Sequence, residues 1–408
     1  MVPLQPIFKK AYLSLVGFGA VYAAFLLALT NKTAQRHALY AHKVHTDYWK
    51  TLDRPESVGF AKHQVTPFYL NTTDGEELYA WHILPIGLYA QHEEAIASQE
   101  PWPPTSFKTS LAYELLKIDP EARVVINFHG NAGHVANGYR PQTYKSLTSA
   151  SSKIHIFTID YRGFGRSTGV PSEMGLITDG VALVNYVLSL GIPPERIVLL
   201  GQSLGTQVAS AVALHFADPT ASAALLPSAE TDINFTDDST LLSKDREPVA
   251  FSGVVLAASF PSLVKLLKVY RFAGLIPVLS PLRVYPYIQS VLLRFIHESW
   301  NTGDRLAALV SSAIKNEHHL NLQILHAAND FDVNWRMGQD NFESCVAAMK
   351  AAADVSVEAT GEWGETIKKV ARWHDKVKVE WQLLMSGGHN RIVADVPVAL
   401  AVMRAFGL

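Results

Sequence analysis

The sequence predicts an α/β protein in which a mostly parallel sheet carries helices on both faces. Short apolar runs alternate along the chain with longer helical stretches, as expected for parallel strands joined by helices. One apolar run, residues 197–200, leads directly into a glycine-containing turn at residues 201–205 and then into a helical stretch of small residues. The 408 residues can bury a large core, so one α/β domain with insertions fits better than two independent domains.

The expected strands and helices alternate from residue 78 toward the end of the chain. Apolar runs predict strands at residues 78–84, 124–128, 154–160, 197–201, 254–257, 322–326 and 377–384. Stretches of helical character predict helices at residues 139–150, 173–190, 204–216, 335–352 and 393–406.

Three stretches interrupt this alternation. Residues 217–250 are polar, acidic and proline-containing, which is typical of a surface insertion, and residues 352–375 form a second expected insertion before the last strand. Residues 260–318 follow the expected strand at 254–257, where folds of this kind carry a cap over the site, and their first part is crowded with leucine, valine and proline. Packing within the cap accounts for this composition, but an apolar wall for an acyl chain or a lip facing a membrane needs the same residues.

The N-terminal residues 1–35 are expected to anchor the chain in a membrane. Residues 11–30 are 20 consecutive residues without a charge, enough to span about 30 Å as a helix. A cleaved signal peptide has a shorter apolar core and a small-x-small cleavage site, which residues 28–30 match poorly. A buried core helix would be apolar on one stripe only. We therefore expect a retained, single-pass anchor followed by a body at residues 36–408.

Composition narrows the classes of function. The net charge of −2 gives no electrostatic case for binding nucleic acid. The single cysteine, Cys345, excludes an intrachain disulfide and lies in a stretch typical of a packed helix. Three sequons, at Asn31, Asn71 and Asn234, slightly favour a lumenal body, whereas the basic residues on both sides of the anchor do not decide its orientation.

The turn at residues 201–205 reads Gly-Gln-Ser-Leu-Gly, and its setting between a strand and a helix is that of a nucleophile elbow. The two glycines allow a sharp turn that presents the hydroxyl of Ser203 above the sheet. An ordinary turn is the alternative. A catalytic reading therefore requires an acid and a histidine later in the chain, in the order Ser, Asp, His.

Candidates for both partners follow later strands. Asp330 and Asp332 come after the expected strand at 322–326, and we favour Asp330 because Asp332 then belongs to the stretch leading into the next helix. His389 follows the last expected strand and two glycines, in a loop that can bring its imidazole over Ser203. The sequence therefore predicts a catalytic triad of Ser203, Asp330 and His389.

A glycine-rich turn, His-Gly-Asn-Ala-Gly at residues 129–133, follows the expected strand at 124–128. The backbone N–H groups of Leu204 and Asn131 are the expected oxyanion-hole donors. A phosphate-binding loop is the alternative, but its Gly-Lys-Ser/Thr is missing. No His-Glu-x-x-His or Cys-x-x-Cys spacing indicates a metal site, and the expected chemistry requires no cofactor.

These motifs resemble those of abhydrolase domain-containing protein 12 and its relatives. The resemblance rests on residues 81–85, 129–133, 160–167, 171–173, 201–205 and 325–327, which occur in this order. It implies the α/β-hydrolase fold and a serine hydrolase on one N-terminal membrane anchor, with its catalytic body in the endoplasmic reticulum lumen. It also implies hydrolysis of monoacylglycerol or lysophospholipid esters, lysophosphatidylserine included. Gln202 departs from the pattern, which usually has histidine there.

We therefore expect a membrane-anchored hydrolase of lipid carboxylic esters that acts through an acyl-enzyme at Ser203. One alternative of the same fold is a thioesterase that removes acyl groups from protein cysteines. An alternative of another class is a non-catalytic binding module held at the membrane. Labelling by a fluorophosphonate probe separates the two enzymes from the binding module.

Overall fold

A ten-stranded sheet forms the centre of the protein in a computed structural model that describes residues 6–44, 50–99, 106–226, 247–272 and 276–408. Its strand order is β1-β2-β4-β3-β5-β6-β9-β12-β11-β10. The strands are β1 (Val65–Asn71), β2 (Glu77–Ile83), β3 (Arg123–Phe128), β4 (Ile154–Ile159), β5 (Ile197–Gln202), β6 (Gly253–Ala257), β9 (Leu320–Ala327), β10 (Ser356–Thr360), β11 (Ile367–Trp373) and β12 (Val377–Leu384).

The strands from β4 to β12 in that order run parallel, and antiparallel strands are added at both edges. The expected α/β fold with a mostly parallel sheet is therefore confirmed. Each of the seven strands expected from the sequence is present, with ends that differ by up to two residues. Because the central strands are parallel, their carboxyl ends meet at one edge, where sites of such folds lie.

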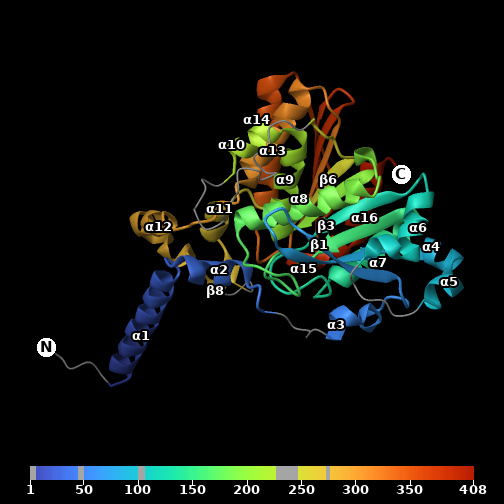
Figure 1. Cartoon of the computed structure of the whole chain (residues 1–408). Helices are drawn as coiled ribbons and strands as arrows, with labels where there is room; N and C mark the ends of the chain where they lie inside the picture. The colour runs from blue at the N-terminus through green and yellow to red at the C-terminus, as the bar shows by residue number, and fades with distance from the viewer. Residues whose placement is uncertain (1–5, 45–49, 100–105, 227–246, 273–275) are drawn as a thin grey trace.

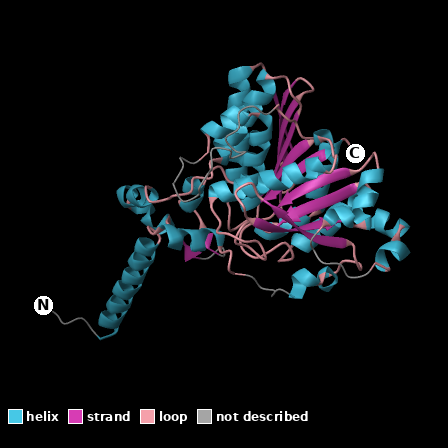
Figure 2. Ribbon diagram, in the orientation of Figure 1, coloured by secondary structure: helices cyan, strands magenta, loops and turns pink. Residues whose placement is uncertain are grey.

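Helices cover both faces of the sheet (Figures 1 and 2). One layer contains α8 (Glu173–Ser189), α9 (Leu204–Ala217), α13 (Thr302–Lys315) and α14 (Arg336–Ala352), and the other contains α7 (Arg140–Ala150) and α16 (Val396–Phe406). Alternate residues of β5 enter the two cores: Ile197 and Leu199 pack with the first layer, Val198 and Leu200 with the second. This alternation follows from the two-residue period of a strand that is buried on both faces.

Several further helices are shorter. They are α2 (Lys32–Tyr40), α3 (Lys50–Asp53), α4 (Ile86–Gln91), α5 (Glu93–Ala97), α6 (Leu111–Ile118), α10 (Pro219–Ala224) and α15 (Gly388–Arg391), with the 3-10 turns η1 (Pro55–Val58), η2 (Phe107–Thr109), η3 (Pro194–Arg196) and η5 (Ile392–Ala394).

The three stretches set apart by sequence have different structures. Most of the insertion expected at 217–250 lies outside the described residues. The insertion expected at 352–375 contains the β10–β11 hairpin, which extends the sheet beside β12. The range 260–318 holds α11 (Leu263–Leu267), β7 (Arg271–Phe272), β8 (Ile276–Pro277), η4 (Ser280–Val284) and α12 (Pro286–Leu293), and then α13. Since α13 packs against α9 and α14, the range 260–318 contains a helix of the sheet layer as well as the stretch expected to form the cap.

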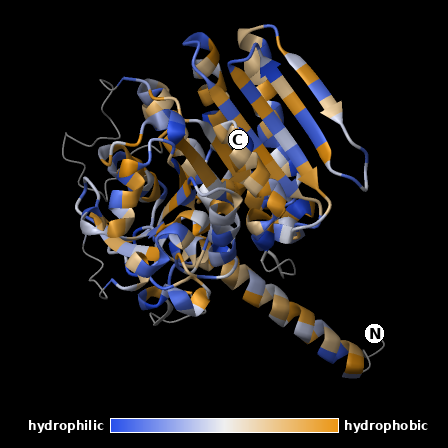
Figure 3. Ribbon diagram, turned by 90° about the vertical axis from the view of Figure 1, so that its right-hand side faces the viewer, coloured by the Kyte–Doolittle hydropathy of each residue, from blue (hydrophilic) through white to orange (hydrophobic). Residues whose placement is uncertain are grey.

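Helix α1 (Pro6–Ala28) projects away from the body, as Figure 1 shows. Leu26 is its one buried residue, and hydrophobic residues, coloured orange, occur along its length in Figure 3. Its 23 residues are long and apolar enough to cross a membrane. The helix begins before the apolar run at 11–30 and includes Lys9 and Lys10 in its first turns.

Candidate active site

Ser203 lies in a strained turn between β5 and α9. Its φ of 51° and ψ of −117° place it in a region that residues other than glycine rarely adopt. The two flanking glycines make the turn possible, because a Cβ at Gly201 would overlap the carbonyl of Gly205 and one at Gly205 would overlap the carbonyl of Phe128. The turn therefore holds the hydroxyl of Ser203 at the carboxyl edge of the sheet, where the residue is 8% exposed.

The structure brings the three predicted triad residues together. His389 Nε2 lies 2.8 Å from Ser203 Oγ, and His389 Nδ1 lies 2.8 Å from Asp330 Oδ2. Asp330 follows β9 and His389 follows β12, so all three side chains come from carboxyl ends of parallel strands. The imidazole thus has one nitrogen on the hydroxyl and the other on a carboxylate, the arrangement of a serine hydrolase.

Asp330, rather than Asp332, contacts the imidazole. Its Oδ1 accepts hydrogen bonds from the backbone N–H groups of Asp332 (3.0 Å) and Val333 (2.8 Å), which leaves Oδ2 directed at His389. Asp332 acts on His389 through its charge alone, by raising the pKa of the imidazole. The preference for Asp330 in the sequence therefore agrees with this geometry.

The electrostatics of the pair keep the carboxylate charged. Burial raises the pKa of Asp330, but hydrogen bonds with His326 and His389 outweigh burial and hold that pKa well below its usual range. Burial likewise lowers the pKa of His389, but the hydrogen bond and charge of Asp330, with the charge of Asp332, raise it overall. The imidazole is thus more basic than a free histidine, which suits a group that must accept a proton.

The turn at residues 129–133 lies directly against the elbow, since a Cβ at Gly130 would overlap the side-chain oxygen of Gln202. Two amides of the turn are occupied: Ala132 N donates to Tyr40 O (3.1 Å) and Gly133 N to Val44 O (2.9 Å). The N–H groups of Asn131 and Leu204 donate to no acceptor within the described part of the chain. These are the two amides that the sequence predicts as oxyanion-hole donors, and Leu204 also begins α9, at the positive end of its dipole.

Arg140 fixes the shape of this turn, and sequence reasoning missed it. Its guanidinium donates to the backbone carbonyls of Gly130 (2.9 Å), Asn131 (3.0 Å), Ala132 (2.7 Å) and His134 (2.5 Å). With the carbonyls turned toward one cation, the amide groups between them face away from it. No motif marks Arg140, because its role depends on the path of the backbone before α7.

Three further side chains position the acid and the base. His326 Nε2 lies 3.2 Å from Asp330 Oδ2 and 3.0 Å from the carbonyl of Val333, inside the buried end of β9. Gln202 Nε2 donates to the carbonyl of His389 (3.0 Å), and Asn329 Oδ1 accepts the amide N–H of Gly388 (2.9 Å). His326 and Gln202 stand inside motifs noted in the sequence, but their contacts appear only when β5, β9 and β12 are adjacent.

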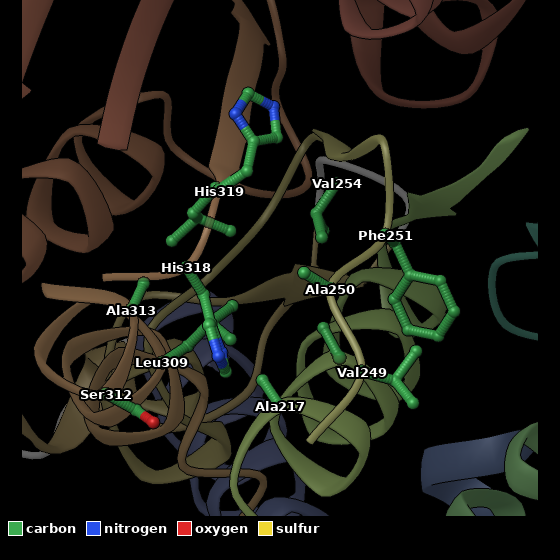
Figure 4. A pocket seen from close by; sticks show the side chains of 12 residues that line it. Ala217, Val249, Ala250, Phe251, Val254, Leu309, Ser312, Ala313, His318 and His319 are labelled. Atoms are coloured by element: carbon green, nitrogen blue, oxygen red, sulfur yellow. The ribbon is translucent and has the colours of Figure 1, made fainter. Parts of the chain in front are cut away.

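A cavity elsewhere does not compete with this site. It has a volume of about 20 Å³ and is lined mostly by apolar residues of α9, α13 and the segments leading into β6 and β9, with Ser312, His318 and His319 also in the lining (Figure 4). That volume holds about one water molecule. The cavity also lies at the amino ends of the strands, opposite Ser203. Among the described residues, no group of three or more His, Cys, Asp or Glu could hold a metal ion.

Comparisons with known proteins agree with this architecture. Residues 123–253 match the sequence profile of a family described as having the alpha/beta hydrolase fold. An alpha-beta hydrolase from Vibrio vulnificus superposes with a TM-score of 0.52 at 15% identity, over 93% of this chain and 92% of that chain. The protein therefore has the α/β-hydrolase fold.

Particular relatives are more closely similar in sequence. Lysophosphatidylserine lipase ABHD12 of Danio rerio is 32% identical over 184 residues, which cover 45% of this chain and 43% of the relative. Protein ABHD12B of Homo sapiens is 30% identical over 198 residues, which cover 47% of this chain and 50% of the relative. The chain thus spans about half the length of the curated relatives it matches. The resemblance predicted from the motifs is confirmed.

Proposed function

We propose that the protein is a membrane-anchored serine hydrolase that cleaves carboxylic esters of lipids, monoacylglycerol or lysophospholipid, through an acyl-enzyme. The chain of contacts from Ser203 Oγ through His389 to Asp330, each 2.8 Å long, carries this proposal. In this reading Ser203 is the nucleophile, His389 the general base and acid, and Asp330 the residue that orients the imidazole.

Acylation begins when Ser203 Oγ attacks the ester carbonyl of the lipid while its proton passes to His389 Nε2. The hydrogen bond to Asp330 keeps the proton of His389 on Nδ1, so that Nε2 is free to accept. The tetrahedral intermediate then breaks its bond to the leaving alcohol. His389 returns the proton to that alcohol, and the acyl group remains as an ester of Ser203.

Deacylation repeats the sequence with water. His389 removes a proton from water, the resulting nucleophile attacks the acyl carbonyl, and the proton returns to Ser203 Oγ as the fatty acid leaves. In both halves the negative oxygen of the intermediate accepts hydrogen bonds from the N–H groups of Leu204 and Asn131. Such a donor contributes about 3–4 kcal/mol to stabilising the transition state.

A lipid substrate is favoured by three features that do not depend on one another. Relatives that this chain matches over a little less than half of their length carry the name lysophosphatidylserine lipase. Helix α1 can hold the chain at a membrane, where lipids are. The cap that follows β6 exposes large apolar side chains, which an acyl chain or a bilayer can contact.

Release of fatty acid by the full-length protein in detergent micelles tests the proposal. The substrates are lysophosphatidylserine, a monoacylglycerol and a peptide acylated on cysteine, and the matched variants are Ser203→Ala and Ser189→Ala. We expect turnover of one or both lipids, loss of it in Ser203→Ala, and no change in Ser189→Ala, whose hydroxyl is exposed on α8. Turnover of the acyl peptide alone would replace the lipid proposal by the thioesterase.

We further propose that the body lies in the endoplasmic reticulum lumen. Asn71 supports this location as an acceptor for glycan, because it is exposed at the end of β1. Asn31 is already engaged as the N-cap of α2, where its side chain accepts from Ala34 N, and Asn234 lies outside the described residues. Endoglycosidase H should increase the gel mobility of the protein, and Asn71→Gln combined with Asn234→Gln should remove that shift. A body that protease digests in intact microsomes would place it in the cytosol.

A further inference from the structure

Four of the residues of α12 are exposed and the other four are half-buried. None of its eight residues is buried. Large apolar side chains on and beside it stand in solvent: Val284 is 75% exposed, Tyr285 59%, Tyr287 80%, Ile288 48% and Phe295 46%. We call these five residues the α12 surface. An apolar patch of this kind, unlike scattered single residues, marks a surface that contacts something else.

The cap segment around this surface, residues 263–297, is strongly basic. It contains Lys265, Lys268, Arg271, Arg283 and Arg294 and no Asp or Glu, and all five basic side chains are exposed. The chain as a whole has a net charge of −2, so the positive charge is a property of this segment. Exposed apolar and aromatic residues among basic ones are typical of segments that lie in the interface of anionic membranes.

The cap segment is joined to α1 through Tyr22 and to α2 through Gln35. Tyr22 Oη donates to the carbonyl of Val278 (2.7 Å), and the side chain of Gln35 donates to the carbonyl of Phe295 and accepts from His297 N (3.2 Å). In Figure 1, α12 lies beside the body end of α1, on the side of the molecule from which α1 projects. The α12 surface and the membrane anchor are therefore neighbours.

The contact with Tyr22 also indicates how deep the cap segment lies in the membrane. Tyr22 lies six residues before the last residue of α1, Ala28, which is about 9 Å along a helix. If α1 leaves the hydrocarbon of the bilayer near Ala28, Val278 lies about 9 Å below that point, on the acyl side of the boundary with the headgroups. Interfacial helices bury their apolar faces to about 5–10 Å, which matches this level.

The same segment leads to the candidate active site. Val278 N donates to the carbonyl of Tyr270 (3.1 Å), and burial together with the charges of Asp332 and Asp330 raises the pKa of the Tyr270 hydroxyl. The helix α2 reaches the other part of the site, because the backbone carbonyl of Tyr40, at the end of α2, accepts a hydrogen bond from the N–H of Ala132 in the turn at residues 129–133. The cap segment therefore links the body end of α1 to the surroundings of Asp330, and α2 links it to the turn at residues 129–133.

We infer that the α12 surface inserts into the interface of an anionic bilayer beside α1, as a second membrane contact that places the Ser203 site near the lipid surface. This inference rests on α1 as the membrane anchor and goes beyond the proposed hydrolase activity. The occupant is the bilayer because the surface is continuous with the anchor, lies at its depth and carries the charge that anionic headgroups attract.

Fluorescence quenching on the full-length chain tests this contact directly. Tyr287→Cys is labelled with an environment-sensitive fluorophore, and the native Cys345 stays unlabelled because it is buried and burial raises the pKa of its thiol to about 12. The protein is reconstituted into phosphatidylcholine vesicles with or without phosphatidylserine, and lipids with a nitroxide near the carbonyl serve as quenchers. The matched control is Ile118→Cys at the end of α6, 69% exposed and far from α1 in Figure 1.

We expect the label at position 287 to be quenched several-fold more than the label at 118, and more strongly with phosphatidylserine present. Equal quenching at the two positions overturns the inference. An emission shift at 287 without quenching by the lipid nitroxide also overturns it, since a protein partner or a second copy would then cover the surface.

A second arm measures the consequence for substrates. In Ile288→Glu, insertion of a charge should lower the hydrolysis of vesicle-borne lysolipid several-fold and leave turnover of a soluble short-chain ester unchanged, whereas Ile118→Glu should alter neither. A parallel loss of both activities contradicts the inference. Absence of any ester turnover in the unmodified protein contradicts the proposed hydrolase instead, and the quenching result then still decides the membrane contact.

Discussion

The carboxyl edge of the sheet and the cap segment at residues 263–297 differ in how fully their side chains are buried and bound by other groups of the protein. At the edge, Ser203, His389 and Asp330 are buried or half-buried and bound to one another, and Arg140 and His326 are bound to the groups around them. On the cap segment, α12 has no buried residue. The edge obtains its contacts from the protein itself, whereas the α12 surface leaves large apolar side chains exposed.

This difference separates two roles. A strained residue such as Ser203 persists only where the surrounding structure determines its position, and the elbow is fixed by β5, α9 and the turn at 129–133. A surface that contacts lipid needs no such precision, but it needs apolar area and the correct charge. Changes at the edge should therefore alter catalysis on every substrate, while changes in the cap should depend on how the substrate is presented.

After the loss of the nucleophile itself, the largest effect at the carboxyl edge of the sheet is expected at the acid. Asp330→Asn should lower kcat by about 10⁴-fold, because the imidazole loses the partner that fixes its tautomer. Asp332→Asn should lower kcat far less, since Asp332 affects His389 only through its charge. Steady-state kinetics on a soluble ester compare the two, and the reverse ranking would show that Asp332 is the acid.

A smaller loss is expected when the turn at residues 129–133 is less tightly held. Arg140→Lys replaces a guanidinium that binds four carbonyls by an ammonium that cannot reach all of them. We expect kcat to fall by about 10²-fold with KM little changed, similar to the loss of one oxyanion donor. A thermal unfolding curve like that of the unchanged protein should accompany this result. An unchanged kcat would mean that the turn holds its shape without Arg140.

His326 should contribute less again, as a positioning residue. His326→Leu removes one hydrogen-bond donor from the Asp330 carboxylate. We expect kcat to fall about tenfold with KM unchanged, because this is the loss that usually follows removal of a hydrogen bond to a charged group. His326→Gln retains a donor and should restore part of that loss. If both variants behave alike, the role of His326 is packing alone.

The smallest effect concerns pH. His389 must be neutral to accept the proton of Ser203, so activity is lost as the pH falls through the pKa of the imidazole. Since that pKa is raised by Asp330 and Asp332, the acidic limb of the kcat/KM profile should lie above the ordinary histidine value of about 6.5. In Asp332→Asn the limb should move to lower pH, because one negative charge near the imidazole is gone. A shift in the opposite direction would contradict this electrostatic account.

Sequence patterns predicted the edge better than the periphery, for physical reasons. The central strands are continuous apolar runs because both faces are buried, so they stand out in the sequence. β1 contains Pro67 and alternates in burial, as an edge strand can, and every residue of β10 is exposed. Neither strand therefore gave an apolar signal.

Some residues of the candidate site could likewise be predicted from the sequence, and others could not. Ser203, Asp330 and His389 could be placed because each follows a recognisable strand and their order along the chain is fixed by the chemistry. Arg140 could not be found, because its contacts are with backbone carbonyls whose positions depend on the folded turn. The boundary between the cap and α13 was likewise invisible, since both are rich in apolar residues and only packing against α9 and α14 separates them.

The central claim is that the edge makes Ser203 a nucleophile, and mapping a fluorophosphonate adduct tests it most directly. The full-length protein in detergent is treated with the probe, digested, and analysed by mass spectrometry, beside Ser203→Ala and the control Ser189→Ala. The account predicts one adduct, on the peptide that contains Ser203, absent in Ser203→Ala and unchanged in Ser189→Ala. An adduct on another residue, or labelling of Ser203→Ala at the level of the unchanged protein, would contradict it.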